Sequence, residues 1–265
     1  MKRLICMLLI AALAFGAAGC GVIRMVTKYA DADKYTAGGF TYEADQVQKI
    51  ELDWTAGGVT LKNGGSTCTV SESGDDSLVA SEKLHWWLDG TTLRIKYCES
   101  GYNHLIRSTQ KHLTLEVPAS VELDVDIASG KVESSEPLTV GELEVDTASG
   151  GVSFSELTAD KAEIDSASGG ISIDRVHAKT VKIDVASGGV TLGVGECKTV
   201  TIDSASGSIV LKLLDPEKGA SVRVEQLSGS FDCKLPMTKD GKTYRIGSGA
   251  VEIKVDSASG SITVE

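Results

Sequence analysis

A short motif, Asp-x-Ala-Ser-Gly, recurs along the second half of the chain at an almost constant interval. Spacings of 20, 19, 19 and 19 residues separate the glycines that end successive copies, which are Gly130, Gly150, Gly169, Gly188 and Gly207. A looser copy ends at Gly229 and a final one at Gly260, and "ELDWTAGG" is a degenerate first copy. Repeats of this length are typical of solenoids, because one unit cannot bury its apolar side alone.

Each repeat has the pattern of two short strands on either side of a tight corner. In one unit Leu143 and Val145 precede the corner, Ala148 lies in it, and Val152 and Phe154 follow. Later units repeat this pattern with Val, Ile, Leu and Ala, so stacking in register would form ladders of like side chains about 4.8 Å apart. We expect these residues to fill the interior and the charged residues between them to face outward.

The sequence therefore predicts an all-β fold, a single-stack β-solenoid with coils of about 19–22 residues. Residues 48–265 would form the solenoid, with regular repeats over 119–265 and irregular first coils over 48–118. Asp89-Gly90 before "TTLRI" is a hairpin signal within those first coils. Residues 20–47 hold few large apolar side chains, and we expect a tether there, with a short strand around Phe40 to Tyr42.

Residues 1–19 have the features of a secretory signal peptide. Lys2 and Arg3 precede an apolar run, and "GAAGC" closes at Cys20 as in a bacterial lipoprotein. Cys20 is the expected lipid-attachment site, which would anchor the chain to the outer face of the cytoplasmic membrane, or to an outer membrane. The alternative is an ordinary secretory signal with a nearby cysteine.

The charge of the chain excludes one class of partner. Removing residues 1–19 takes away Lys2 and Arg3, which leaves 26 − 2 = 24 basic and 37 acidic residues and a formal net charge of −13. Nucleic-acid affinity comes largely from Lys and Arg on phosphates, so nucleic acid is not an expected partner.

The repeated aspartate allows three interpretations: a calcium ligand, half of a catalytic carboxylate pair, or a structural turn. Calcium needs six to eight oxygens, and each coil brings one acid near its corner. Catalytic acids need different environments, whereas these acids would be nearly equivalent. We favour an Asx-turn with Gly supplying a positive φ. The predicted turn residues are Asp146, Ser149, Gly150, Asp165, Ser168, Gly169, Asp184, Ser187, Gly188, Asp203, Ser206 and Gly207.

Cysteines and aromatic residues offer two further candidate features. Cys68 and Cys98 flank a hairpin-like excursion and could form a disulfide, although Cys98 shares its parity with outward-facing residues. Trp86 and Trp87 are adjacent, so they should point to opposite faces of a strand, with one exposed as a binding platform for sugar or peptide. The plainer interpretation is that a wide first coil needs large fillers.

No motif in the sequence indicates catalysis, a cofactor or a metal. The four histidines lie in separate contexts, and the chain has no Gly-x-Ser-x-Gly elbow, phosphate loop, dinucleotide fingerprint or Cys-x-x-Cys. We therefore expect a protein that is not an enzyme and that holds no resident metal.

The stretch "LTLEVPASVELDVDIASGKVE", Leu113 to Glu133, followed by Ser-Gly repeats, resembles the bacterial putative-adhesin β-strand-repeat family, also called Toastrack domains. The likeness runs from about Lys49 to Glu265. It implies a single-stack β-solenoid associated with the bacterial envelope, with some relatives linked to sensing envelope stress or antimicrobial peptides. The family supplies no catalytic or ligand residue to transfer.

The leading functional hypothesis is a non-enzymatic envelope lipoprotein that presents a binding surface, in adhesion or envelope-stress sensing. Its partners would be another envelope protein, a glycan or a cationic peptide. The alternatives are a solenoid that binds or cleaves carbohydrate through Trp86 and Trp87, and a structural spacer. The chain ends in "GSITVE", so we also expect an open strand edge at Glu265 that permits self-association.

Overall fold

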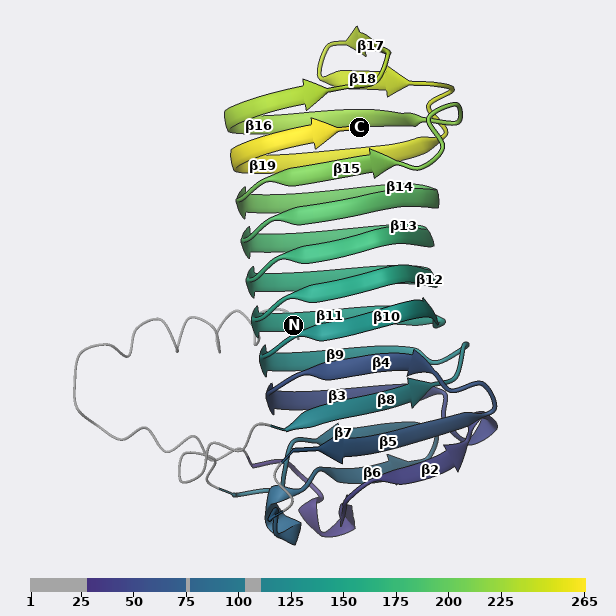
Figure 1. The fold of residues 1–265 in the computed structure, drawn as a ribbon, viewed down its shortest axis with the longest axis vertical. Coiled ribbons are helices and arrows are strands. Elements are labelled where there is room, and N and C mark those ends of the chain that lie inside the picture. Colours follow the sequence, from purple (N-terminus) through teal and green to yellow (C-terminus); the bar gives the residue numbers. More distant parts are fainter. Residues whose placement is uncertain (1–27, 75–76, 103–110) are drawn as a thin grey trace, which may run out of the picture.

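The computed structural model describes residues 28–74, 77–102 and 111–265, and these form one continuous β structure of 19 strands wound into a rod. Figure 1 shows the strands stacked across the long axis, with the irregular first coils at one end and the C-terminal strands at the other. The predicted all-β solenoid is confirmed. No helix of the described residues has the length and apolar character of a membrane span.

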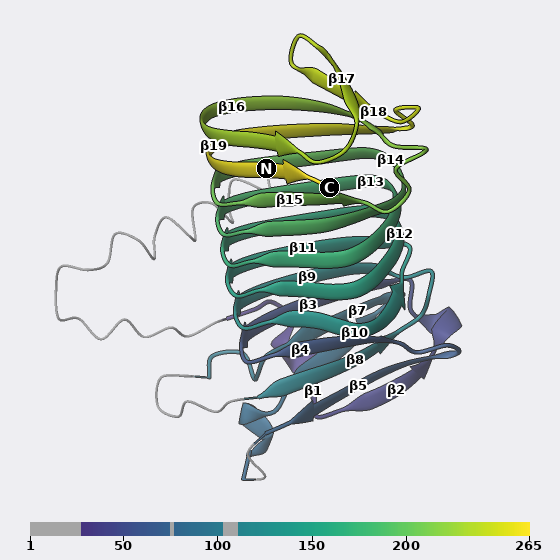
Figure 2. The same ribbon diagram turned by 45° about the horizontal axis from the view of Figure 1, so that its top comes forward.

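The middle of the rod consists of coils that repeat in register. Its strands are β9 (Glu122–Ser129), β10 (Val132–Thr139), β11 (Glu142–Ser149), β12 (Val152–Ser168), β13 (Ile171–Ser187), β14 (Val190–Ser206) and β15 (Ile209–Leu213). Neighbouring coils pair in parallel at the spacing of the repeat, so that Val152 lies beside Ile171 and Asp165 beside Asp184. The 17-residue strands β12, β13 and β14 continue around a coil rather than ending at each wall (Figure 2).

Aliphatic side chains fill the inside of every coil. Val145, Ile164, Ile183 and Ile202 form one ladder and are fully buried. Burial of such a side chain stabilises the fold by about 1.5–3 kcal/mol relative to exposure. Because the ladder repeats in each coil, the rod has one unbroken apolar interior along its length.

The motif alanine does not face the interior, so this part of the prediction is wrong. The strand alternation continues through the motif: the Asp faces outward and the following residue is buried, as at Thr147 and Ser166. The alanine is then turned outward again, and Ala186 and Ala205 are exposed at the outer corner. The aspartates also lie within strands, which continue to the serine, and the Asx-turn prediction does not describe these corners.

Glycine is required at the corner because neighbouring coils approach too closely for a side chain. Gly150 has φ 157° and Gly169 has φ 150°. A Cβ atom on Gly169 would lie 1.9 Å from the carbonyl oxygen of Gly150 in the preceding coil. The corner backbone is satisfied between coils, since the Gly150 N–H donates to the Ser168 carbonyl.

The first coils are built from strands that return to the stack more than once. β3 (Lys49–Ala56) pairs in parallel with both β7 (Thr92–Lys96) and β9, and β4 (Val59–Asn63) pairs with β8 (His112–Val117) and β10. β6 (His85–Asp89) and β7 form the predicted hairpin around Asp89-Gly90. β5 (Thr67–Ser73) pairs antiparallel with β8, which ends the parallel stacking on this side.

The segment expected as a tether is folded in its described part. It contains the short helical turns η1 (Ala32–Lys34) and η2 (Ala44–Gln46) and the strands β1 (Thr36–Ala37) and β2 (Phe40–Glu43). β1 pairs with β6 and β2 pairs with β5, which confirms the short strand expected around Phe40. The tether assignment is therefore wrong from Thr36 onward, because this segment supplies strand partners and aromatic side chains to the first coils.

Large side chains and a buried cation fill this end of the interior. The Lys111 side chain is fully buried, with its ammonium 3.0 Å from the Glu72 carboxylate and 2.8 Å from the Glu82 carbonyl oxygen. Its nitrogen also lies 4.1 Å from the centre of the Tyr97 ring and 5.0 Å from that of Trp54. Glu82 belongs to the helical turn η3 (Ala80–Glu82). Burial lowers the pKa of Lys111, and the Glu72 charge opposes that shift.

The C-terminal strand is not an open edge, which corrects the prediction for Glu265. β19 (Val251–Val264) pairs with β14 and β15 on one side and with β16 (Ala220–Cys233) on the other. The order of the last corners in space is therefore Gly207, Gly260, Gly229. β16 is the outermost coil, and the hairpin of β17 (Met237–Asp240) and β18 (Thr243–Ile246) extends beyond it (Figure 1).

The structure does not contain the predicted disulfide. Cys68 and Cys98 are both buried thiols, and burial raises the pKa of each to about 12. Cys68 faces the interior from β5, whereas the Cys98 thiol donates to the carbonyl of Glu99 beyond the end of β7. Each thiol is accommodated separately.

We expect Gly169→Ala to destabilise the fold by about 3 kcal/mol or more, because it combines a positive φ with a clash against backbone. Chemical denaturation would measure the change. The matched control is Gly170→Ala, whose Cβ would lie 3.7 Å from the Gly189 carbonyl oxygen. Equal stability of the two variants would contradict the role given to the corner glycine.

Candidate functional site: a charged face along the rod

One wall of the rod carries charged side chains in three parallel files, which together we name the charged face. The strands of this wall are β3, β9, β11, the second halves of β12, β13 and β14, and the first halves of β19 and β16. The central file contains the repeated aspartates. Its members, in spatial order, are Asp53, Asp126, Asp146, Asp165, Asp184, Asp203, Asp256 and Glu225.

Parallel stacking in register places these carboxylates side by side. Adjacent strands lie about 4.8 Å apart, so like charges face each other at every step of the file. The structure thus brings together Asp146, Asp165, Asp184 and Asp203, as the repeat predicted. It places the associated serines, such as Ser168 and Ser187, exposed at the outer corner and the glycines within the bend.

Cations offset the acids along much of this face. At the N-terminal end Lys96 pairs with Asp53, Arg94 with Glu51 and Lys49 with Glu122. In the middle, Glu163 is only 2% exposed and lies between two lysines, 2.9 Å from Lys161 and 3.3 Å from Lys182. Burial would raise the pKa of Glu163, but the hydrogen bonds from these lysines outweigh it and lower the pKa.

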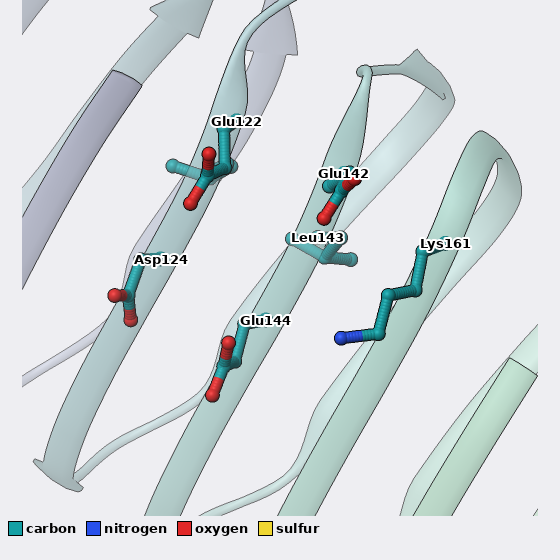
Figure 3. A pocket seen from close by; sticks show the side chains of 7 residues that line it. Glu122, Asp124, Glu142, Leu143, Glu144 and Lys161 are labelled. Atoms are coloured by element: carbon teal, nitrogen blue, oxygen red, sulfur yellow. The ribbon is translucent and has the colours of Figure 1, made fainter. Parts of the chain in front are cut away.

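Strands β9 and β11 hold the largest concentration of acids, which we name the acidic patch. Figure 3 shows four of its side chains on these neighbouring strands, with Lys161 at the next strand. Three registered pairs form the patch: Glu122 with Glu142, Asp124 with Glu144, and Asp126 with Asp146.

Burial and mutual repulsion change the acidity of the patch. Burial, followed by the charges of Asp126 and Asp165, raises the pKa of Asp146 to about 7. Burial, followed by the charge of Asp126, raises the pKa of Asp124 to about 6. The patch therefore takes up protons close to neutral pH, where ordinary carboxylates are fully ionised.

The form of the patch indicates what it can contact. The depression among Glu122, Asp124, Glu142, Glu144 and Lys161 has a volume of about 10 Å³, which holds about one water molecule. Among the described residues, no group of three or more His, Cys, Asp or Glu is arranged to hold a metal ion. An open charged wall of this kind suits contact with a macromolecule or peptide.

The two candidate tryptophans belong to separate aromatic clusters. Trp86 packs against Phe40 and Tyr42, with ring centres 4.2 Å and 5.5 Å away. Tyr35 lies against Trp87, and the Lys34 ammonium is 4.5 Å from the centre of that ring. The side chains of Trp86 and Trp87 therefore contact different neighbours, as expected for adjacent residues of one strand. Both side chains are partly exposed, and residues from the segment 34–42 pack against each of them.

Sequence reasoning identified the aspartate file and placed the charged residues beside it on the outside, but it did not identify the registered acid pairs of β9 and β11. Glu142 and Glu144 lie four and two residues before Asp146, and Glu122 and Asp124 lie at the same distances before Asp126. The spacing of these acids was the sequence signal for the patch, because residues two apart in a strand lie on the same face of the sheet.

Comparison with known protein families identifies the family of this chain. The sequence profile of the family Toastrack DUF4097 matches residues 47–258. The chain belongs to the Toastrack family. A search of the curated proteins found no match.

Several solved structures resemble the Toastrack domain of this chain. A "putative adhesin" from Bacteroides fragilis has 16% sequence identity and a TM-score of 0.46, with 86% of this chain and 96% of that chain covered. A "putative adhesin" from Parabacteroides merdae has 14% identity and a TM-score of 0.46, with coverage of 87% and 97%. A "putative lipid binding protein" from Parabacteroides distasonis has 15% identity and a TM-score of 0.41, with coverage of 86% and 97%.

The raised pKa of Asp146 predicts a pH dependence of stability with a definite sign. The folded state binds this proton more tightly than the unfolded state, whose Asp has a pKa near 3.9, so acidification stabilises the fold. We expect the free energy of unfolding to rise as pH falls from about 8 to about 5. Asp146→Asn should raise stability at pH 8 and reduce this slope.

Chemical denaturation at several pH values would measure the effect. Asp160→Asn is the matched control, since Asp160 is 65% exposed, lies outside the acidic patch and pairs with Lys179. A slope unchanged by Asp146→Asn, or one of opposite sign in the parent protein, would contradict the repulsion inferred within the patch.

Proposed function

We propose that this Toastrack protein is a non-enzymatic lipoprotein of the bacterial cell envelope whose acidic patch binds a cationic partner. The observation that carries the proposal is the set of three registered acid pairs on β9 and β11, on an open wall whose depression among these acids has a volume of about 10 Å³. A rigid, repetitive wall holds its charges at fixed spacing and loses little conformational entropy on binding.

The apolar interior supports a binding role over a catalytic one. The coil interior is filled by Val, Ile and Leu ladders from end to end of the regular stack. The partner that such a wall suits is an extended cationic segment, such as a Lys-rich or Arg-rich peptide.

The envelope location is supported by the start of the chain and by the family. The signal-like sequence and Cys20 lie outside the described residues, and they predict export and lipid attachment. The protein is acidic, so a covalent anchor would hold it at a membrane whose anionic head groups repel it. Adhesion and the sensing of cationic envelope-active peptides are the two roles that this arrangement favours.

We expect a Lys-rich peptide of about 20 residues to bind the protein and to dissociate as ionic strength rises, because salt screens exposed charges. The triple variant Asp124→Asn, Glu144→Gln, Asp146→Asn should weaken binding by about tenfold or more. Fluorescence anisotropy with a labelled peptide would measure both effects.

The control for this variant carries the same change in charge outside the charged face: Glu133→Gln, Glu136→Gln, Asp174→Asn on β10 and β13. A Glu-rich peptide of equal length tests the sign of the charge. If the control variant loses as much affinity as the patch variant, the binding reflects net charge alone and the patch has no special role.

Lipid attachment at Cys20 makes a separate prediction. Cys20→Ser should move the protein from the membrane fraction to the soluble fraction of the exporting cell, because a signal peptide alone leaves no anchor after cleavage. Cell fractionation and mass spectrometry of the mature N-terminus would measure this. An unmodified Cys20 in the parent protein would contradict the anchor.

A further inference from the structure

Lys111 and Glu72 form an ion pair that is closed off from solvent. The Lys111 Nζ lies 3.0 Å from a carboxylate oxygen of Glu72, and the two side chains are 0% and 8% exposed. The two lysines that flank the buried Glu163, by contrast, are 42% and 27% exposed. Burial of two charges costs free energy that their attraction does not always recover, so this site favours a change that removes both charges together.

The contacts around the Lys111 nitrogen leave one direction for a lone pair. This nitrogen donates hydrogen bonds to two backbone carbonyl oxygens, that of Glu82 at 2.8 Å and that of Tyr97. The Glu72 carboxylate occupies the third direction. When the ammonium passes one proton to Glu72, the neutral amine keeps its two hydrogens on the carbonyl oxygens, and its lone pair is directed at the Glu72 carboxyl group.

The Glu72 carboxyl group is held in place to receive that amine. Antiparallel pairing of β5 with β8, in which Ser73 lies opposite His112, brings Glu72 close to Lys111. The Leu84 N–H donates to both carboxylate oxygens of Glu72, at 2.9 Å and 3.0 Å. A fixed backbone donor stabilises the negative charge that develops on a carbonyl oxygen during attack, and fixed reactants have a high effective concentration.

Aromatic rings cover the pair on another side. The Lys111 nitrogen lies 4.1 Å from the centre of the Tyr97 ring and 5.0 Å from that of Trp54, and these two residues are 7% and 2% exposed. Burial lowers the pKa of Lys111, which favours the neutral amine that attack requires. The covered site also disfavours hydrolysis, because water is the other product of joining an amine to a carboxyl group.

We propose that the side chains of Lys111 and Glu72 join in an intramolecular isopeptide bond. The Lys111 nitrogen attacks the Glu72 carboxyl carbon and forms a C–N bond. One carboxyl oxygen then leaves as water, with one proton from the acid and one from the amine. An ammonium and a carboxylate thus become one amide and one water, so the step needs no oxidant or other co-reactant.

The bond links β5 to the residue before β8 and encloses residues 73–110 in a covalent loop. This loop contains η3, β6 and β7, and therefore the strands that pair with β1 and β3. The cross-link keeps the first coils closed, at the end of the rod where the chain enters. It depends neither on the acidic patch nor on a lipid at Cys20, so its failure and that of the proposed function are distinguishable.

Peptide mapping of the full-length gene product, purified from the cells that make it and denatured before digestion, tests the bond. Trypsin cuts after free lysine and arginine but not after an acylated lysine. We therefore expect one branched peptide that joins residues 63–83 to residues 108–131. Its mass should be about 18 Da below the sum of the two chains, and tandem mass spectrometry should place the link between Lys111 and Glu72.

Lys111→Met and Glu72→Leu should each abolish the branched peptide. The matched control is Lys182→Met, which removes a lysine from the buried Glu163 and should leave the branched peptide unchanged. The parent protein decides the question even where a variant does not fold. Residues 108–111 and 112–131 recovered from it as separate, unlinked peptides would overturn the proposal, and so would a branched peptide that persists in Lys111→Met.

Discussion

Parallel pairing of coils in register is the constraint on which the rest of this structure depends. It places each residue beside its equivalent in the next coil, about 4.8 Å away. This register stabilises the apolar interior, because Val145, Ile164 and Ile183 lie side by side and pack as a ladder of similar side chains. The corner is constrained by the same pairing, since the glycine of one coil lies directly against the glycine carbonyl of the preceding coil. The residue type at a position in this fold therefore depends on the equivalent residues of the neighbouring coils as much as on the residues of its own coil.

The same register has an opposite effect on charged residues. A column of aspartates stacks like charges, and burial followed by repulsion from neighbouring carboxylates raises the pKa of Asp146 and of Asp203. In the middle coils Lys161 and Lys182 offset the repulsion by enclosing Glu163. β9 and β11 themselves carry no lysine on this face, and the nearest cations are Lys49 on β3 and Lys161 on β12. Raised pKa values that cluster on an open surface are typical of functional sites, which favours this patch as a binding surface.

The sequence predicts the regular coils well because their determinants are local. The 19-residue period, the alternation of Val and Ile, and the corner glycine each appear within one repeat, and the structure follows all three. The side on which Ala186 lies was misjudged because the corner was assumed to begin at the aspartate. The alternation of buried and exposed side chains in fact continues through the motif, so that the residue before the alanine is buried and the alanine faces outward. The aspartate file was foreseen, whereas the patch depends on which coils bring glutamates into register and which bring lysines.

The sequence could not predict the order in which the strands at the two ends of the rod join the stack. The corners at Gly229 and Gly260 are 31 residues apart, and nothing local shows that the later one enters the stack first. That order follows from pairing, because β19 gains strand partners on both sides and leaves β16 outermost. Residues 36–43 likewise have the sequence features of a tether, because the strands that pair with them, β5 and β6, lie elsewhere in the chain.

The two ends of the rod thus differ in how they cover the last strand and the apolar interior. At the N-terminal end antiparallel strands, aromatic rings and the paired cation of Lys111 close the interior, and the parallel stacking of coils ends there. At the C-terminal end a hairpin covers only the beginning of β16, while Tyr244 stacks on Phe231 at 4.3 Å and closes the interior behind it. The interior is sealed but the backbone edge beside Leu227 is not. The two ends of the rod therefore differ, and this difference gives the rod a direction.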